Sequence, residues 1–265
     1  MEILADALGP GYVTRAAEAL LRLPRGVVLI ATGFYVRGAA ETDGPPGAWA
    51  IAKALQSLGF SPMIVTDDPC RGVFEREEIP VIYEGTDLTA ADCDALLDRL
   101  EPKALISIER CGINSGGIYA NAANKDISQW TAPLSVLFDE ASARGILTVG
   151  IGDGGNEIGM GKLSALIIDA LGVRASQTTT DHLIVATTSN WGGYALAAAL
   201  EQLSGTRCLP EAEDTGRFLA DLVDEGLINA LGDGDNYGVD GFPAAVGIDI
   251  IRQLRHLIDS ERKDS

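Results

Sequence analysis

The stretch ILTVGIGDGGNEIGMGK, residues 146–162, decides the fold, because three kinds of segment follow one another within it. Residues 146–151 are apolar and rich in β-branched side chains, which is typical of a strand buried on both faces. A glycine-rich loop with acidic side chains comes next, and a helix is predicted over residues 161–171. A buried strand that leads through a loop into a helix is the repeating unit of a parallel α/β sheet.

The same alternation extends over the whole chain. Further strands are predicted at residues 27–31, 62–66, 79–83, 104–108 and 182–186. Further helices are predicted at residues 12–23, 45–58, 89–100, 133–144, 192–203, 214–228 and 243–259, with a glycine- and aspartate-rich loop at 232–241. Such crossovers are right-handed. We therefore predict an α/β fold with a mostly parallel sheet and helices on both faces, three-layered and Rossmann-like. It forms a single domain, residues 1–265, with a frayed tail at 260–265.

Composition limits the classes of partner. The 265 residues are 46% hydrophobic, which is enough for a core without disulfides or metals. Acidic residues outnumber basic ones 38 to 20, and the formal charge of -18 repels nucleic acid and anionic membranes. The sequence shows no signal peptide, no membrane-spanning apolar run and no CxxC pair among four cysteines. We expect a cytoplasmic protein with no nucleic-acid or membrane partner; a homo-oligomer is compatible with these features.

Polar segments follow four of the predicted strands. They read TGFYVRGAAETDGPPG (32–47), IERCG (108–112), GDGGNEIGMGK (152–162) and TTSNWGGYA (187–195). In an open parallel sheet, ligands bind outside the carboxyl ends of the strands. We therefore expect the four loops to converge on one crevice.

The loop after residue 151 contains the pattern G-x-G-x-x-G at Gly150, Gly152 and Gly155. This pattern can bind a dinucleotide when it opens a helix. Here Asp153 and Glu157 lie inside the loop and would repel a phosphate, and the spacing of a P-loop is absent. We expect no nucleotide cofactor.

Asp153, Asn156 and Glu157 bring three oxygen-bearing side chains within five positions. Such a set suits Mg²⁺ or Mn²⁺, or the ammonium group of a substrate. The alternative is an aspartate that caps the next helix, with glycines serving only the turn. Two acids and an amide exceed what a cap needs, so we favour a functional site.

The other loops allow two interpretations each. ETDGPPG (41–47) is either an ordinary turn before a helix or part of an acidic site. Glu109 and Arg110 could form an ion pair at the rim, or Arg110 could hold a substrate carboxylate in a two-pronged contact. Asn190 could contact substrate or lie at a helix cap, and Lys162 could neutralise a carboxylate or be solvated.

Long segments of the chain resemble the D-glutamate cyclase family. The resembling segments are TGFYV (32–36), ETDGPPGA (41–48), IVTD (64–67), IER (108–110), DIS (126–128), GIGDGGNEIGMGK (150–162), TDHLIVATTSNWGGYALAAAL (180–200) and VDGF (239–242). The resemblance implies a carbon–oxygen lyase that converts D-glutamate to 5-oxo-D-proline and water by intramolecular amide formation. Such a reaction needs a general base for the ammonium and a group that neutralises the leaving oxygen.

With this resemblance, roles can be assigned to particular residues. Asp153, Glu157 and Glu109 would be catalytic, and Asp153 or Glu157 would be the base. The substrate-binding residues would be Asn156, Asn190, Arg110, Lys162, Thr42, Asp43, Gly154 and Gly155. A divalent cation, Mg²⁺ or Mn²⁺, would be held by Asp153, Glu157 and Asp43, and Glu41 would complete the acidic wall. Glu157→Gln is then expected to abolish turnover while the fold persists.

Two other classes of function are compatible with the sequence. One is a non-catalytic binding protein for an acidic amino acid or a divalent cation. The other is a related lyase or phosphate-ester enzyme that acts on another small acidic metabolite. The acidic loop disfavours phosphate, and the absence of a GxSxG motif disfavours nucleophilic hydrolysis.

Overall fold

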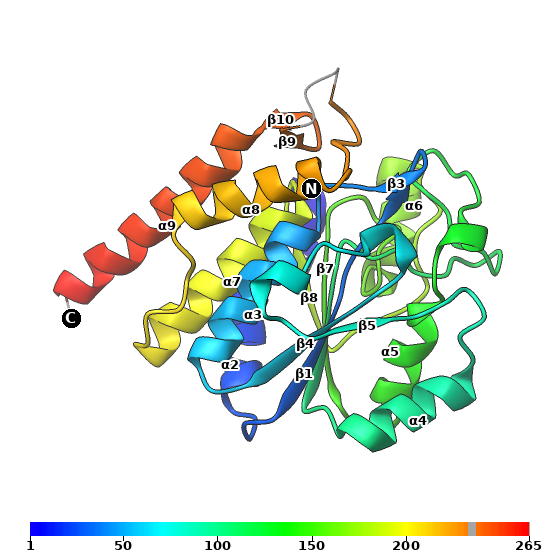
Figure 1. Cartoon of the computed structure of the whole chain (residues 1–265), viewed down its shortest axis with the longest axis horizontal. Coiled ribbons are helices and arrows are strands. Elements are labelled where there is room, and N and C mark those ends of the chain that lie inside the picture. Colours follow the sequence, from blue (N-terminus) through cyan, green and yellow to red (C-terminus); the bar gives the residue numbers. More distant parts are fainter. Residues whose placement is uncertain (233–236, 265) are drawn as a thin grey trace.

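The central sheet has six strands in a computed structural model that describes residues 1–232 and 237–264 (Figure 1). Its order is β5 (Val81–Tyr83), β4 (Ser61–Thr66), β1 (Val27–Ala31), β6 (Ala104–Ile108), β7 (Leu147–Gly152) and β8 (His182–Val185). All neighbouring pairs are parallel, which confirms the predicted sheet. Residues 233–236 of the expected glycine- and aspartate-rich loop lie outside the described residues.

Helices cover both faces of the sheet. On one face lie α2 (Tyr12–Leu21), α3 (Pro45–Ser57) and α7 (Ser189–Ser204), and on the other lie α4 (Ala90–Leu100) and α5 (Leu134–Ala143) (Figure 1). This confirms the three-layer arrangement. It also explains why four of the five residues of β6 are apolar, because all five are buried between the two helical layers.

The remaining elements surround this framework. Helices α8 (Ala212–Asp224) and α9 (Ala244–Asp264) pack outside α7, while α1 (Glu2–Leu8) and α6 (Ser164–Leu171) lie near the β8 edge. Short 3₁₀ turns occur at Asp68–Cys70, Glu75–Glu77, Ser128–Trp130 and Gly161–Leu163. None of the helices in the described part of the chain combines the length and apolar character needed to cross a bilayer.

The chain builds the sheet outward from β1 in two directions. It first adds β4 and β5 on one side of β1, then returns to place β6, β7 and β8 on the other side. The gap between the carboxyl ends of β1 and β6 is therefore a topological switch point. Ligands of doubly wound α/β proteins bind at such a point, because the loops on either side turn away from each other.

Three small elements were absent from the sequence prediction. Helix α1 is short, and only Leu4 of it is buried, so it has no usable periodicity. The hairpin of β2 (Tyr35–Val36) and β3 (Ala39–Ala40) lies within the predicted loop 32–44, and both turn residues, Arg37 and Gly38, have positive φ, as in a type I′ turn. A second hairpin joins β9 (Gly238–Val239) to β10 (Phe242–Pro243).

Several predicted helices differ at their ends; α8, for example, ends at Asp224 and not at residue 228. Helix α7 begins at Ser189, three residues before the predicted start, and this places its first backbone N–H groups at the switch point. Helix α9 continues through residues 260–264, where a frayed tail was expected.

Helices α3 and α7 pack unusually close together. A Cβ atom on Gly193 would lie only 2.8 Å from the Cα atom of Gly47, so glycine at this position permits the close approach. The two helices start next to each other as a result, and Asn190 in the first turn of α7 reaches the first turn of α3.

Candidate functional site

A pocket of about 430 Å³ lies at the carboxyl edge of the sheet, and we call it the acidic pocket. Its described lining consists of Phe34, Val36, Glu41, Glu109, Asn121, Ala122, Ala123, Asp153, Gly154, Asn156, Glu157, Thr187, Ala230, Leu231, Asp240 and Phe242. None of these lining residues is Lys, Arg or His. The four loops predicted to converge contribute to the pocket or to the hydrogen bonds directly beneath it.

The start of helix α7 joins three of the acidic side chains. The backbone N–H of Ser189 donates to Asp43 Oδ2 at 2.9 Å and to Asp153 Oδ2 at 3.0 Å. The Ser189 hydroxyl donates to Glu109 Oε2 at 2.5 Å. The first N–H groups of a helix have no partner within the helix and carry partial positive charge, so they favour nearby carboxylates.

Asp43 also connects the starts of helices α3 and α7. Its Oδ1 accepts hydrogen bonds from the N–H groups of Gly44 at 3.0 Å and Asn190 at 2.8 Å. The side chain is 1% exposed. This aspartate is therefore fixed by backbone donors on both helices.

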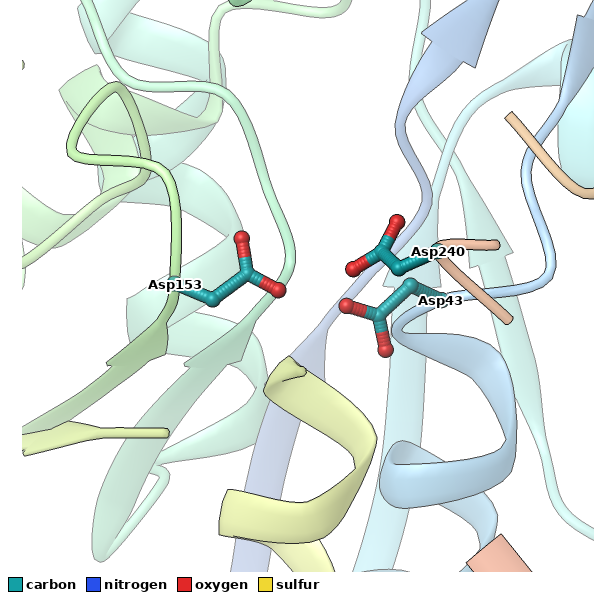
Figure 2. Close-up of side chains that lie close together, drawn as sticks. All are labelled: Asp43, Asp153 and Asp240. Carbon is teal, nitrogen blue, oxygen red and sulfur yellow. The ribbon is translucent and has the colours of Figure 1, made fainter. Parts of the chain in front are cut away.

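Asp240 completes a group of three carboxyl groups with Asp43 and Asp153, which point toward one another in Figure 2. One oxygen from each of the three lies within 4.8 Å of the others. Sequence reasoning missed Asp240 as a site residue, although it lies in VDGF (239–242), one of the resembling segments. Its φ of 51° is rare for a residue other than glycine.

A second group of three acids shares Asp153 with the first group. One oxygen each from Glu109, Asp153 and Glu157 also lie within 4.8 Å of one another. Oxygen ligands in such groups suit a hard divalent cation, so the residues of both groups fit Mg²⁺ or Mn²⁺. The sequence had placed Asp43, Asp153 and Glu157 in one ligand set, whereas the structure divides them between two.

The glycine-rich loop wraps around its own glutamate. Glu157 Oε1 accepts hydrogen bonds from the N–H groups of Asp153 at 3.1 Å and Gly154 at 2.5 Å, and its Oε2 accepts one from Gly155 at 2.7 Å. Gly155 has φ of 101°, which a side chain would oppose. A side chain occupies these N–H groups, so they are not free for the substrate binding expected of Gly154 and Gly155.

Burial and mutual repulsion raise the pKa values of the pocket acids. Burial, followed by repulsion from neighbouring carboxylates, raises the pKa values of Glu41, Glu109 and Asp153 well above their ordinary values. The pKa of Asp43 is raised to about 7 by burial and then by the charge of Asp240. Burial also raises the pKa of Asp240. Near neutral pH this pocket must therefore hold protons, bind cations, or do both.

Glu109 adopts a strained backbone conformation. Its φ of 42° lies in the left-handed region, which costs a residue with a side chain on the order of 1–3 kcal/mol. At this turn the side chains of Glu109 and Arg110 point in different directions. Glu109 lines the pocket, while Arg110 is directed into the protein interior.

Arg110 does not have the position expected of a substrate-binding residue. Its guanidinium is 1% exposed, pairs with Asp67 at 2.5 Å and donates to the carbonyl oxygens of Gly33 and Ala132. Asp67 in turn accepts the N–H of Ala132 at 3.0 Å. The buried pair therefore ties together the loops that follow β1, β4 and β6, and it is not part of the pocket lining.

The side chains of Asn190 and Thr42 are also engaged in hydrogen bonds within the protein, so they are not free to bind a substrate. Asn190 Oδ1 accepts the N–H groups of Gly44 at 3.0 Å and Gly47 at 2.8 Å, and its Nδ2 donates to the Thr42 carbonyl at 3.0 Å. The Thr42 hydroxyl donates to the Gly238 carbonyl at 2.6 Å. Both side chains position the pocket acids and do not line the pocket.

Lys162 and Asn156 differ in their relation to the pocket. Lys162 is exposed and donates to the carbonyl of Asp181 at 2.8 Å, beside the amino end of β8 and therefore at the opposite edge of the sheet. It cannot neutralise a substrate carboxylate in the pocket. Asn156 lines the pocket, and its Nδ2 donates to the Ala120 carbonyl at 2.8 Å.

A family model described as "D-glutamate cyclase-like, C-terminal" matches residues 2–255. The chain belongs to the D-glutamate cyclase-like family. The human protein named "D-glutamate cyclase, mitochondrial" is 36% identical to this family member over 199 residues. That match covers 65% of this chain and 32% of the human protein, so the chain spans about a third of the length of this relative.

A solved structure was also compared with this D-glutamate cyclase-like chain. An exopolyphosphatase-related protein from Bacteroides fragilis aligns over 95% of this chain and 58% of its own, with a TM-score of 0.45 and 9% sequence identity. At that level of likeness we transfer neither ligand nor activity from it. The family assignment therefore rests on the family model and the human relative.

Proposed function

We propose that this chain is a D-glutamate cyclase, which converts D-glutamate to 5-oxo-D-proline and water. Membership of the D-glutamate cyclase-like family supports a reaction of this class. The observation that carries the proposal is the acidic pocket, in which Asp153 and Glu109 line one space and both have raised pKa values. One carboxyl can then act as base while the other acts as acid.

The proposed reaction makes two demands on the pocket. The α-ammonium group must lose a proton so that its nitrogen can attack the γ-carbon, and one γ-carboxylate oxygen must leave as water. The carbon–nitrogen bond forms as a carbon–oxygen bond breaks, and the protons lost by the nitrogen balance those gained by the oxygen. Positioned acids and bases accelerate such proton transfers by about 10²- to 10⁴-fold each.

Asp153 is the better candidate for the base. Its Oδ2 accepts the backbone N–H of Ser189, and its carboxyl otherwise shares hydrogen bonds with the carboxyls of Asp43 and Asp240. Glu157 was the other candidate from the sequence, but three backbone N–H groups surround its carboxylate. Asp153 is also partly exposed, while Glu157 is 0% exposed, so Asp153 is the more accessible to a substrate ammonium and Glu157 shapes the loop.

Glu109 is suited to the role of acid. Its carboxyl is 6% exposed, and its raised pKa favours the protonated form near neutral pH. The hydroxyl of Ser189 fixes one of its oxygens, the carboxyl also shares a hydrogen bond with Glu41, and the residue lines the pocket. A protonated Glu109 can give its proton to the oxygen that leaves as water.

The substrate carries two carboxylates, and the lining residues that the structure describes include no basic side chain to hold them. A divalent cation, Mg²⁺ or Mn²⁺, held by Asp153 with Asp43, Asp240, Glu109 or Glu157, would neutralise carboxylate oxygen when bound. The ammonium group would be attracted by the same acids. We also propose a cytoplasmic location, although the human relative is mitochondrial by name.

The direct test is incubation of the purified chain with D-glutamate, with and without Mn²⁺ or Mg²⁺, followed by chiral chromatography. We expect 5-oxo-D-proline with D-glutamate, much less product with L-glutamate, and about 10²- to 10⁴-fold less from Asp153→Asn. A rise in melting temperature with D-glutamate, but no product with either ion, would favour a non-catalytic binding protein.

A further inference from the structure

We propose that the acidic pocket also cyclises γ-D-glutamyl amides whose amine carries an apolar group, with release of 5-oxo-D-proline and the free amine. The inference rests on the proposed cyclase function, because the α-nitrogen again attacks the γ-carbon and only the leaving group differs. It is drawn from the apolar residues, the volume and the charge of the pocket.

Large apolar side chains line the acidic pocket beside its acids. Phe34 and Val36 lie before and in β2, Leu231 follows α8, and Phe242 begins β10. We call these four residues the apolar rim. Leu231 is 70% exposed and Phe242 is 37% exposed, so the described residues leave much of both side chains uncovered. Exposed apolar surface at a pocket is typical of a ligand-binding groove, because its burial by a ligand is favourable.

A hydrogen bond and a ring contact hold the apolar rim in position. The Arg37 guanidinium donates to the Ala230 carbonyl at 2.7 Å, and this joins the β2–β3 hairpin to the residue before Leu231. The ring of Phe242 lies against that of Trp191 on helix α7, with 5.1 Å between the ring centroids. The rim is therefore built from anchored segments, and a ligand that contacts it does not have to order them first.

The acidic pocket is larger than D-glutamate requires. Its volume of about 430 Å³ lies in the range of about 300–1,000 Å³ that is usual for pockets of drug-sized ligands. D-Glutamate is a much smaller molecule, and its only apolar part is a pair of methylene groups. A glutamyl group held at the acids therefore leaves space for an apolar group attached to it, and the apolar rim supplies the surface to contact that group.

The charge of the pocket favours an amide over a carboxylate at the γ-carbon. The described lining includes Glu41, Glu109, Asp153, Glu157 and Asp240 but no Lys, Arg or His. A γ-carboxylate brings a further negative charge among these acids, and like charges at close range are unfavourable. An amide is neutral, and its N–H can donate to a carboxylate oxygen. Only the α-carboxylate of such a substrate then needs a positive partner.

The amide also makes the γ-carbon a better electrophile, because its carbonyl is already neutral whereas a carboxylate must first be neutralised. The α-nitrogen loses two protons as its bond to the γ-carbon forms. The bond from the γ-carbon to the amide nitrogen breaks, and that nitrogen leaves with the electron pair and gains two protons. Asp153 as base and Glu109 as acid can carry these protons, as in the cyclase reaction.

Two amides that differ only in the size of the apolar group test the inference. The purified chain is incubated with γ-D-glutamyl isobutylamide, γ-D-glutamyl methylamide or D-glutamate, each with and without Mn²⁺, and 5-oxo-D-proline is measured by chiral chromatography. The two leaving amines have similar basicity, so the comparison reports contact with the apolar group. We expect kcat/KM to be at least about tenfold higher for the isobutylamide.

Variants at exposed leucines show whether the apolar rim makes that contact. Leu231→Ala should lower the ratio of the two kcat/KM values at least about threefold, because it removes apolar surface from the rim. Leu203→Ala, at a 43% exposed residue near the end of α7, is the matched control and should leave the ratio unchanged. Thermal melts check that the variants are folded, and Phe242→Ala is the second rim variant.

Equal kcat/KM values for the two amides, or an unchanged ratio in both rim variants, would overturn the proposal. In water labelled with heavy oxygen, the product of the first turnovers should contain no label, because water takes no part in the reaction. Label in 5-oxo-D-proline would show hydrolysis to D-glutamate before ring closure and would also overturn it.

The three substrates separate this inference from the proposed function. Product from D-glutamate but from neither amide would refute the amide activity and leave the cyclase function standing. Product from the isobutylamide but not from D-glutamate would support the inference and refute the expulsion of water. No product from any of the three would refute both.

Discussion

Asp43 and Asp153 accept hydrogen bonds from the same backbone N–H group, that of Ser189, at 2.9 and 3.0 Å. Asp43 lies between β3 and α3, and Asp153 lies in the loop that follows β7. Their carboxyl groups are consequently close. Burial and neighbouring charges, that of Asp43 among them, raise the pKa of Asp153, while a hydrogen bond with Asp153 opposes the rise in the pKa of Asp43. The start of helix α7 therefore organises the acids on which the proposed chemistry depends.

Replacement of Asp153 by Asn should separate catalysis from stability. The amide oxygen can still accept the Ser189 N–H, but the side chain can no longer take a proton. We expect product formation to fall about 10²- to 10⁴-fold, as for loss of a general base. Removal of one of several repelling charges should leave the melting temperature of metal-free protein unchanged or higher. Asp68→Asn, an exposed residue paired with Arg71, should retain full activity.

Metal-free protein should lose stability as the pH rises from about 4 to 7. The pKa of Asp43 is raised from 3.8 to about 7 on folding, so the folded state binds more protons in this window. Excess protons in the folded state mean that stability falls with rising pH. We expect a loss of at least ~1 kcal/mol, or about 2–4 °C in melting temperature.

Thermal melts between pH 4 and 8 with a chelator present would measure this dependence. The fall should be reduced in Asp43→Asn, which cannot ionise. Mn²⁺ should restore stability more at pH 8 than at pH 5, because the cation competes with protons for the same oxygens. A melting temperature that rises steadily with pH would contradict the interpretation.

Glu157→Gln should lower stability as well as activity, which modifies the expectation from sequence alone. A glutamine has one acceptor oxygen, while Glu157 accepts three N–H groups on two oxygens. The unpaired N–H groups should cost about 1–3 kcal/mol in urea unfolding. Glu84→Gln, at a partly exposed residue that is not among the described lining residues of the acidic pocket, is the control. Equal stability of the two variants would show that the loop holds its shape without Glu157.

The Arg110–Asp67 pair should behave as a structural pair. Arg110→Met leaves Asp67 buried without its partner, and we expect a loss of about 3–5 kcal/mol. Arg71→Met breaks the neighbouring surface pair with Asp68 and should cost less than about 1 kcal/mol. Urea unfolding measures both variants. A stable Arg110→Met protein with a raised KM would instead support the substrate-binding role.

Replacement of a helix glycine by alanine should have opposite effects on stability at Gly193 and at Gly247. A Cβ at Gly193 would lie 2.8 Å from Gly47 Cα and 2.9 Å from Ile108 Cδ1, so Gly193→Ala should cost about 1–3 kcal/mol. A Cβ at Gly247 would meet its nearest neighbour, Trp191 Nε1, at 3.6 Å. Gly247→Ala should therefore gain up to about 1 kcal/mol from helix propensity. Thermal melts that move both variants in the same direction would contradict this assignment of close packing.

Local sequence predicted the framework well where burial produces a continuous apolar run. The predicted ranges 27–31 and 104–108 coincide with β1 and β6, because both strands are covered by helices on their two faces. Alternation with helices then requires parallel strands, and parallel strands require their following loops to share an edge. That reasoning predicts that Glu109 and Asp153 lie at the same edge of the sheet.

The sequence could not assign partners across the chain. Arg110 follows a strand as a substrate-binding arginine would, and only the fold shows that Asp67 occupies its guanidinium. Asn190 resembles a substrate contact until its bonds to the start of α3 are seen. Asp240 has no distinctive neighbours in sequence, and it joins the site because the β9–β10 hairpin is held beside Thr42.

The sequence by itself therefore determined the elements, the parallel sheet and the edge at which the acidic loops meet. These follow from apolar periodicity and chain connectivity, which act over a few residues at a time. Tertiary structure alone decided which polar groups are used up by the protein and which remain free for a ligand. That distinction depends on hydrogen bonds between residues far apart in sequence, such as Asp43 and Ser189, and no local pattern records them.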